Sequence, residues 1–89
     1  MAIKHVKTRS GFEIDIDEIV LDDMEVLDYL TAIDGQDYTK YPLLLNKLFG
    51  EAEKKRLYDH VRTPDGRVPY SAFDAEITDI FNGVKAGKN

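Results

Sequence analysis

Six carboxylates lie within the segment from Asp17 to Leu30, which reads DEIVLDDMEVLDYL. Carboxylates at this density could bind a hard cation, exchange protons in acid–base catalysis, or present an acidic surface to a partner. They could also be the solvent-facing residues of an ordinary helix. The large apolar residues between them recur at intervals of three and four, which is the spacing of an amphipathic helix. The segment is therefore mainly an apolar pattern that builds the fold, with acids in the gaps.

Residues that commonly carry catalysis or bind metals are sparse. His5 and His60 occur in no metal-binding spacing, and the chain has no cysteine. The turn Asp65-Gly66-Arg67-Val68 has the glycine and the apolar residue of a twelve-residue calcium loop. However, Val61 and Ala72 stand where that loop has its first ligand and its bidentate glutamate. We therefore expect no cofactor, no metal site and no catalytic activity.

Charge is distributed unevenly along this chain of net charge −5. Residues 13–37 carry ten acids and no Lys or Arg, whereas residues 38–67 carry seven bases. This asymmetry predicts attraction between an acidic and a basic part of one fold, or an acidic surface for a basic partner. The negative charge argues against nucleic acid as a partner. No run is long and apolar enough to cross a membrane, so a membrane is not expected either.

The sequence predicts one small domain over residues 1–89, of the α+β class and mainly α-helical. Residues 1–16 are expected to form a β-hairpin, because Phe12 to Ile16 alternate apolar and acidic residues after a turn at Gly11. Residues 17–84 are expected to form a bundle of four to five short helices on which the hairpin packs. Residues 85–89 are expected to be a frayed tail.

Capping and turn residues predict where the helices begin and end. Asp17 is a helix N-cap, and a second cap at Asp22-Asp23 starts a longer helix that ends at Asp34-Gly35. Pro42 suits the first turn of the next helix, and Gly50 suits the residue after its end. The remaining expected elements are a basic helix over 51–62, a turn over 63–66 and a closing helix that starts within 69–71.

We expect a single core of large apolar side chains from the helices, with Phe12 and Ile14 of the hairpin over it. Its expected helical members are Leu27, Leu30, Leu44, Leu48, Phe73, Ile77 and Ile80.

The short helix after Pro42 carries apolar residues on too many sides for all of them to be buried in so small a domain. We therefore expect self-association or partner binding through the apolar side chains that stay exposed. Neighbouring tyrosines should lie in the interface, and nearby acids should steer a basic partner toward it. The expected partner-binding residues are Tyr38, Tyr41, Leu43, Leu45, Asp22, Asp23 and Asp28.

Two long segments, SGFEIDIDEIVLDDMEVLDYL and PLLLNKLFGEAEKKRLYDHVRTPDGRVPYSAFDAEITDIF, resemble the small tail assembly chaperones of long-tailed bacteriophages and prophages. The matching features lie in order at Ile16–Asp23, Pro42–Gly50, Lys54–Arg62 and Asp65–Val68. The resemblance implies a non-enzymatic protein in the cytoplasm of the bacterial host. It also implies a partner, the tape measure protein, whose helical segments such a chaperone binds and keeps soluble while the tail tube assembles.

The residues alone leave an alternative open. A small acidic regulatory or inhibitory interaction module, such as a mimic of DNA, would share this composition. A mimic needs its acids on one continuous face, whereas Asp15 is expected in a strand and Asp22 to Asp28 in helices.

Overall fold

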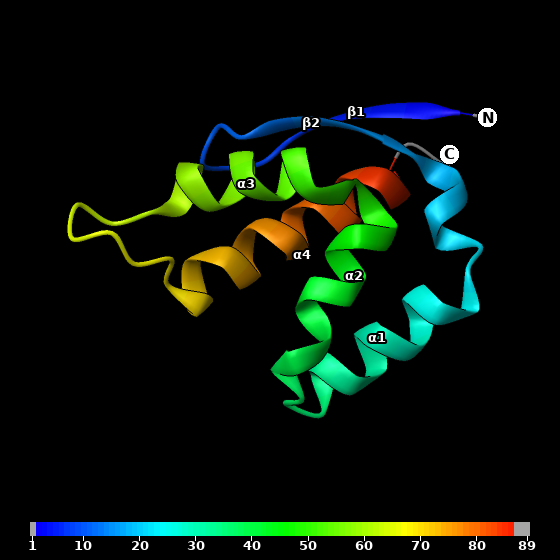
Figure 1. The fold of residues 1–89 in the computed structure, drawn as a ribbon. Helices are drawn as coiled ribbons and strands as arrows, with labels where there is room; N and C mark the ends of the chain where they lie inside the picture. Colours follow the sequence, from blue (N-terminus) through cyan, green and yellow to red (C-terminus); the bar gives the residue numbers. More distant parts are fainter. Residues whose placement is uncertain (1, 87–89) are drawn as a thin grey trace.

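The computed structural model describes residues 2–86, and these form a hairpin followed by four α-helices and two short 3-10 helices (Figure 1). The predicted α+β, mainly α-helical class is confirmed. Of the expected frayed tail, Lys85 and Ala86 belong to the last helix, and residues 87–89 lie outside the described residues. The elements are β1 (Ile3–Lys7), β2 (Glu13–Asp17), η1 (Glu18–Leu21), α1 (Met24–Asp34), η2 (Tyr38–Lys40), α2 (Tyr41–Leu48), α3 (Gly50–Val61) and α4 (Tyr70–Ala86).

The hairpin forms where the alternating pattern predicts it. β1 and β2 pair antiparallel, with Val6 opposite Ile14. Both of these side chains and that of Ile16 are buried, whereas the acids between them point to solvent. Gly11 makes the turn possible, because its φ of 97° lies in the left-handed region that disfavours a side chain. Two strands alone are marginal in water, so the buried face must rest on helices.

The hairpin lies across α3 and α4, and its closest approach is to α4 (Figure 1). Gly83 permits this approach. A Cβ atom at this position would lie 2.5 Å from Cγ1 of Val6, which is closer than two carbon atoms can pack. The absence of a side chain at Gly83 therefore sets the distance between strand and helix.

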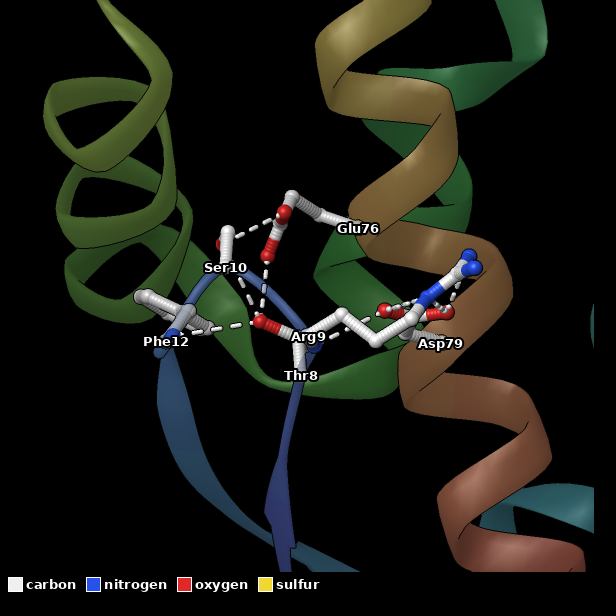
Figure 2. Close-up of polar contacts among 6 residues, drawn as sticks. All are labelled: Thr8, Arg9, Ser10, Phe12, Glu76 and Asp79. Atoms are coloured by element: carbon white, nitrogen blue, oxygen red, sulfur yellow. Dashed lines mark hydrogen bonds and ion pairs between the residues drawn. The ribbon is translucent and has the colours of Figure 1, made fainter.

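A buried carboxylate joins the hairpin turn to α4. Glu76 is only 5% exposed, and its two oxygens accept hydrogen bonds of 2.7 Å from the hydroxyls of Thr8 and Ser10 (Figure 2). The Thr8 hydroxyl also accepts the backbone N–H of Phe12 at 3.1 Å. A buried carboxylate without such donors would be strongly unfavourable, so the turn and α4 depend on one another.

A second carboxylate, one helical turn further along α4, binds the same turn from outside. Asp79 accepts the backbone N–H of Arg9 at 3.0 Å, and the Arg9 guanidinium lies 2.9 Å from it (Figure 2). The Arg9 side chain is largely exposed to solvent, so its ion pair with Asp79 contributes little. The hydrogen bond from the Arg9 backbone N–H therefore does more than the ion pair to hold the hairpin turn against α4.

Both predicted aspartate caps are confirmed. Asp17 accepts the N–H of Ile19 at 3.1 Å at the start of η1, and Asp23 accepts the N–H of Glu25 at 2.9 Å at the start of α1. Gly50, the first residue of α3 and two positions after the end of α2, has the expected positive φ of 85°. At the end of α1 the positive φ falls on Gln36, one residue after Gly35.

Most of the predicted core is buried, but Leu27 was assigned to it wrongly. Leu27 is 46% exposed, and the buried face of α1 carries Val26 and Ile33 instead. Apolar residues occur all around this helix, so their spacing did not select one face; packing against α2 does. The expected core residues that are buried are Phe12, Ile14, Leu44, Leu48, Phe73, Ile77 and Ile80, and Leu30 is partly buried against them.

Replacing Ile77 with Ala should lower the free energy of unfolding by about 2–5 kcal/mol, because it removes a buried side chain and leaves a cavity. The melting temperature should fall by roughly 8 °C or more in a domain of this size. The control is Leu27→Ala, which should change the free energy of unfolding by only about 0.5 kcal/mol or less. Thermal melts followed by circular dichroism measure both, and similar melting temperatures for the two variants would contradict the core described here.

Replacing Gly83 with Ala should destabilise the fold although alanine favours helix by up to about 1 kcal/mol. The added methyl group meets Val6, whose branched side chain is stiff and buried, and overpacking of this kind costs about 1–3 kcal/mol. Asn82→Ala, at the exposed neighbouring position, should instead leave the stability unchanged or raise it. If the denaturant concentration at the unfolding midpoint of Gly83→Ala is equal to or higher than that of wild type, the contact between position 83 and Val6 has room for a methyl group and this prediction is wrong.

Candidate functional site

A groove of about 310 Å³ lies between α1 and α4. Its volume is at the lower end of the range of about 300–1,000 Å³ that is usual for ligand pockets. Apolar side chains form both walls: Leu30 and Ile33 from α1, and Ile77 and Phe81 from α4. The full lining is Leu30, Ile33, Asp34, Tyr41, Asp74, Ile77, Thr78, Phe81, Asn82 and Lys85.

Helical periodicity explains why these residues share a groove. Positions 74, 78, 81 and 85 are successive turns of one face of α4, and positions 30, 33 and 34 are one face of α1. Leu27 lies one turn before Leu30 on that helix, but its half-exposed side chain is not part of the groove lining. The sequence marked these residues as core or as solvated helix surface, and nothing in their spacing indicated a groove.

The groove carries charge at two separate places. Asp34 and Asp74 lie at the end of α1 and near the start of α4, whereas Lys85 lies in the last turn of α4. Asp74 accepts a hydrogen bond from the hydroxyl of Tyr41. Asp34 and Lys85 are exposed, and their side chains have no ion pair or hydrogen bond within residues 2–86. Both side chains are therefore exposed at the rim of the groove.

A second, aromatic hollow of about 280 Å³ lies on the other side of Tyr41. The rings of Tyr38 and Tyr70 pack with centroids 4.3 Å apart, and Tyr41 meets Phe73 edge-on at 5.2 Å. Desolvation, together with the Tyr38 hydroxyl, raises the pKa of Tyr70 to about 12. Burial and the nearby Asp74 also raise the pKa of Tyr41, so its phenol stays protonated as a donor. The lining is Tyr38, Tyr41, Pro42, Tyr58, Val68, Tyr70 and Phe73.

Two expected partner-binding residues lie in the interior instead. Leu45 is 0% exposed and Tyr41 is 7% exposed, so neither offers its side chain as an outer binding surface. The reason is helical geometry, because positions 41, 44, 45 and 48 face the core together. Tyr41 does line both hollows at its edge. Leu43, on the opposite side of α2, is 44% exposed, and Tyr38 is comparably exposed.

Of the three acidic residues expected to bind a partner, Asp23 has structural contacts, whereas Asp22 and Asp28 are exposed to solvent. Asp23 caps α1 and lies 2.8 Å from the ammonium group of Lys47, which also contacts Glu25 at 3.0 Å. The hydrogen bond from Lys47 holds the pKa of Asp23 below its usual value. The predicted attraction between the acidic and basic parts of the chain is present in these pairs. Asp22 and Asp28 are exposed and have no ion pair or side-chain bond within the described range 2–86.

The histidines belong to hydrogen-bond networks. His60 Nε2 lies 2.8 Å from the Ser10 hydroxyl, which donates its proton to Glu76, so serine stands in the middle of this network. A nucleophilic triad has histidine in the middle, as the base that receives the serine proton. The exposed His5 lies 2.7 Å from both Asp15 and Glu13 across the hairpin, and hydrogen bonds to Asp15 and then Glu13 raise its pKa.

Residues 2–86 contain no group of three or more His, Cys, Asp or Glu side chains placed to hold a metal ion. Within the same range no helix is both long and apolar enough to cross a bilayer.

Comparison of the chain with protein-family models, curated proteins and solved structures gives no match.

Replacing Asp23 with Ala should lower the melting temperature at neutral pH, because the cap of α1 and the ion pair with Lys47 are lost together. Asp22→Ala is the matched control and should melt like wild type. The folded-state pKa of Asp23 is lowered, so its stabilising effect is present above the unfolded-state pKa of about 3.9 and is lost as the pH falls through the folded-state pKa. The difference between wild type and Asp23→Ala should thus shrink below about pH 4. Equal melting temperatures for Asp23→Ala and Asp22→Ala at neutral pH would show that the cap and the ion pair of Asp23 do not stabilise the fold.

Proposed function

We propose that this protein is a non-enzymatic tail assembly chaperone that binds helical segments of a phage tape measure protein. It keeps that protein soluble in the cytoplasm of the bacterial host while the tail assembles. The observation that carries the proposal is the groove between α1 and α4, whose walls are apolar and whose charged groups at Asp34 and Lys85 are unpaired within residues 2–86.

The groove suits an amphipathic helix better than a small polar substrate. A partner helix of this kind lays residues at i, i+3, i+4 and i+7 into a hydrophobic groove and leaves its polar face in water. Leu30 and Phe81 stand on opposite walls, where they can contact such a stripe. A third helix placed between two others also buries apolar surface in the manner of a helix bundle.

Binding of this kind explains how a small protein could keep a much longer one soluble. Long helical proteins with apolar stripes associate through those stripes when nothing covers them. The chaperone covers a stripe and adds its own charged surface, with exposed acids such as Asp22 and Asp28 on the outside. The identity of the partner rests on the order of sequence features that resembles the tail assembly chaperones.

The alternative of a DNA mimic has less support. Asp15 pairs with His5 on the hairpin, and Asp23 and Glu25 pair with Lys47. These carboxylates lie on separate elements and are partly neutralised, so they do not form one continuous acidic face.

Co-expression with the tape measure protein of the same phage or prophage tests the proposal. Wild-type chaperone should increase the soluble fraction of that protein and co-purify with it. Thr78→Arg places a long cationic side chain at an exposed position in the groove and should abolish both effects. Ala52→Arg, an equal change at an exposed position on α3 outside both hollows, should behave like wild type.

Circular dichroism and thermal melts of both variants confirm that each is folded before solubility is compared. Equal solubility of the tape measure protein with and without the wild-type chaperone would refute the proposed function.

A further inference from the structure

We infer that the groove between α1 and α4 selects a helix by charge as well as by its apolar stripe, and that charge sets the direction in which the helix lies. The occupant is an amphipathic helix with a basic side chain at one end and an acidic side chain about three turns away on the same flank. The source of the helix, a tape measure protein, rests on the proposed function. The binding preference itself rests only on the groove.

The first observation is the separation of charge along the groove. Asp74 and Lys85 both line it, and they are eleven positions apart on α4, which corresponds to about 16 Å along the helix axis. Asp34 lines the same groove from the final residue of α1. Since α1 and α4 run in opposite directions (Figure 1), the last residue of α1, Asp34, lies toward the start of α4, which is the end of the groove that carries Asp74. The groove therefore has an acidic end and a basic end.

The second observation is that the charges at the two ends are not neutralised by the fold. Within residues 2–86, neither the Asp34 nor the Lys85 side chain has an ion pair or a hydrogen bond. Most other charged side chains on the helices are paired: Lys47 with Asp23, for example, and Arg56 with Glu53. An unpaired acid and an unpaired base at opposite ends of an apolar groove complement a ligand with the reverse arrangement.

The third observation concerns what lies between the ends. Leu30, Ile33, Ile77 and Phe81 occupy the middle of the lining, with only the uncharged Thr78 and Asn82 on the α4 rim. A ligand charge placed there would lose water without gaining a partner, which is unfavourable. The middle of the occupant must therefore be apolar, and its charges must lie at its ends.

Synthetic helical peptides provide the probe. One capped peptide carries a leucine stripe over three turns, with glutamate in the first turn and lysine in the last; a second exchanges the two charges, and a third has glutamine at both positions. Titration into the ¹⁵N-labelled protein should shift the amide signals of the groove residues. Two exposed ion pairs should make either charged peptide bind roughly threefold to tenfold more tightly than the glutamine peptide at low salt.

A nitroxide label on the amino terminus of each peptide reports direction. The first peptide should broaden signals near Lys85, and the second should broaden signals near Asp34. In the double variant Asp34→Lys, Lys85→Glu both patterns should reverse. Thr78→Arg should weaken binding of all three peptides, and Ala52→Arg should not.

The inference is overturned if the label broadens the same end for both charged peptides, if all three bind equally, or if none binds at the groove. Amide shifts confined to Tyr38 and Tyr70 would place the peptides in the aromatic hollow and would also overturn it. Peptide binding as expected, with no effect on tape measure solubility, would refute the proposed function alone. Peptide binding without the expected charge preference, together with increased solubility of the tape measure protein, would refute only the charge preference.

Discussion

The contact between the hairpin and α4 is the constraint on which the rest of the structure depends. Gly83 brings the backbone of α4 against Val6, and the buried Glu76 binds the hydroxyls of the hairpin turn. Glu76 and Gly83 are seven residues apart, so both point to the same side of the helix. That side is occupied by the hairpin, and the opposite side, which carries Thr78 and Lys85, is left to line the groove. One helix thus has a face that packs on the hairpin and an opposite face that lines the groove.

The groove also depends on how α1 is attached. This helix packs on α2 through Val26 and Ile33, and Lys47 of α2 pairs with Asp23 at its start. α2 therefore holds α1, and α1 and α4 stand apart with Tyr41 between them.

The carboxylates between residues 17 and 34 have different structural roles. Asp17 and Asp23 cap helices, and Asp23 and Glu25 hold Lys47. Asp28 has no partner within residues 2–86, and Asp34 lines the groove. The sequence could not separate these roles, because a carboxylate that caps a helix and one that faces a ligand look alike until the position of the next helix is known.

The sequence by itself determined the hairpin, the caps, the order of the helices and most of the core. These follow from local patterns: alternation in Phe12 to Ile16, aspartate before a helix, and proline or glycine at its ends. Only the tertiary structure decided that Val26 rather than Leu27 is buried, that Leu45 is inaccessible while Leu43 is exposed, and that α1 and α4 enclose a groove. The physical reason is that an apolar side chain can be buried by any neighbour, so its type shows that it prefers burial but not which helix covers it. That choice is made by packing between segments far apart in the chain, such as Val6 and Gly83.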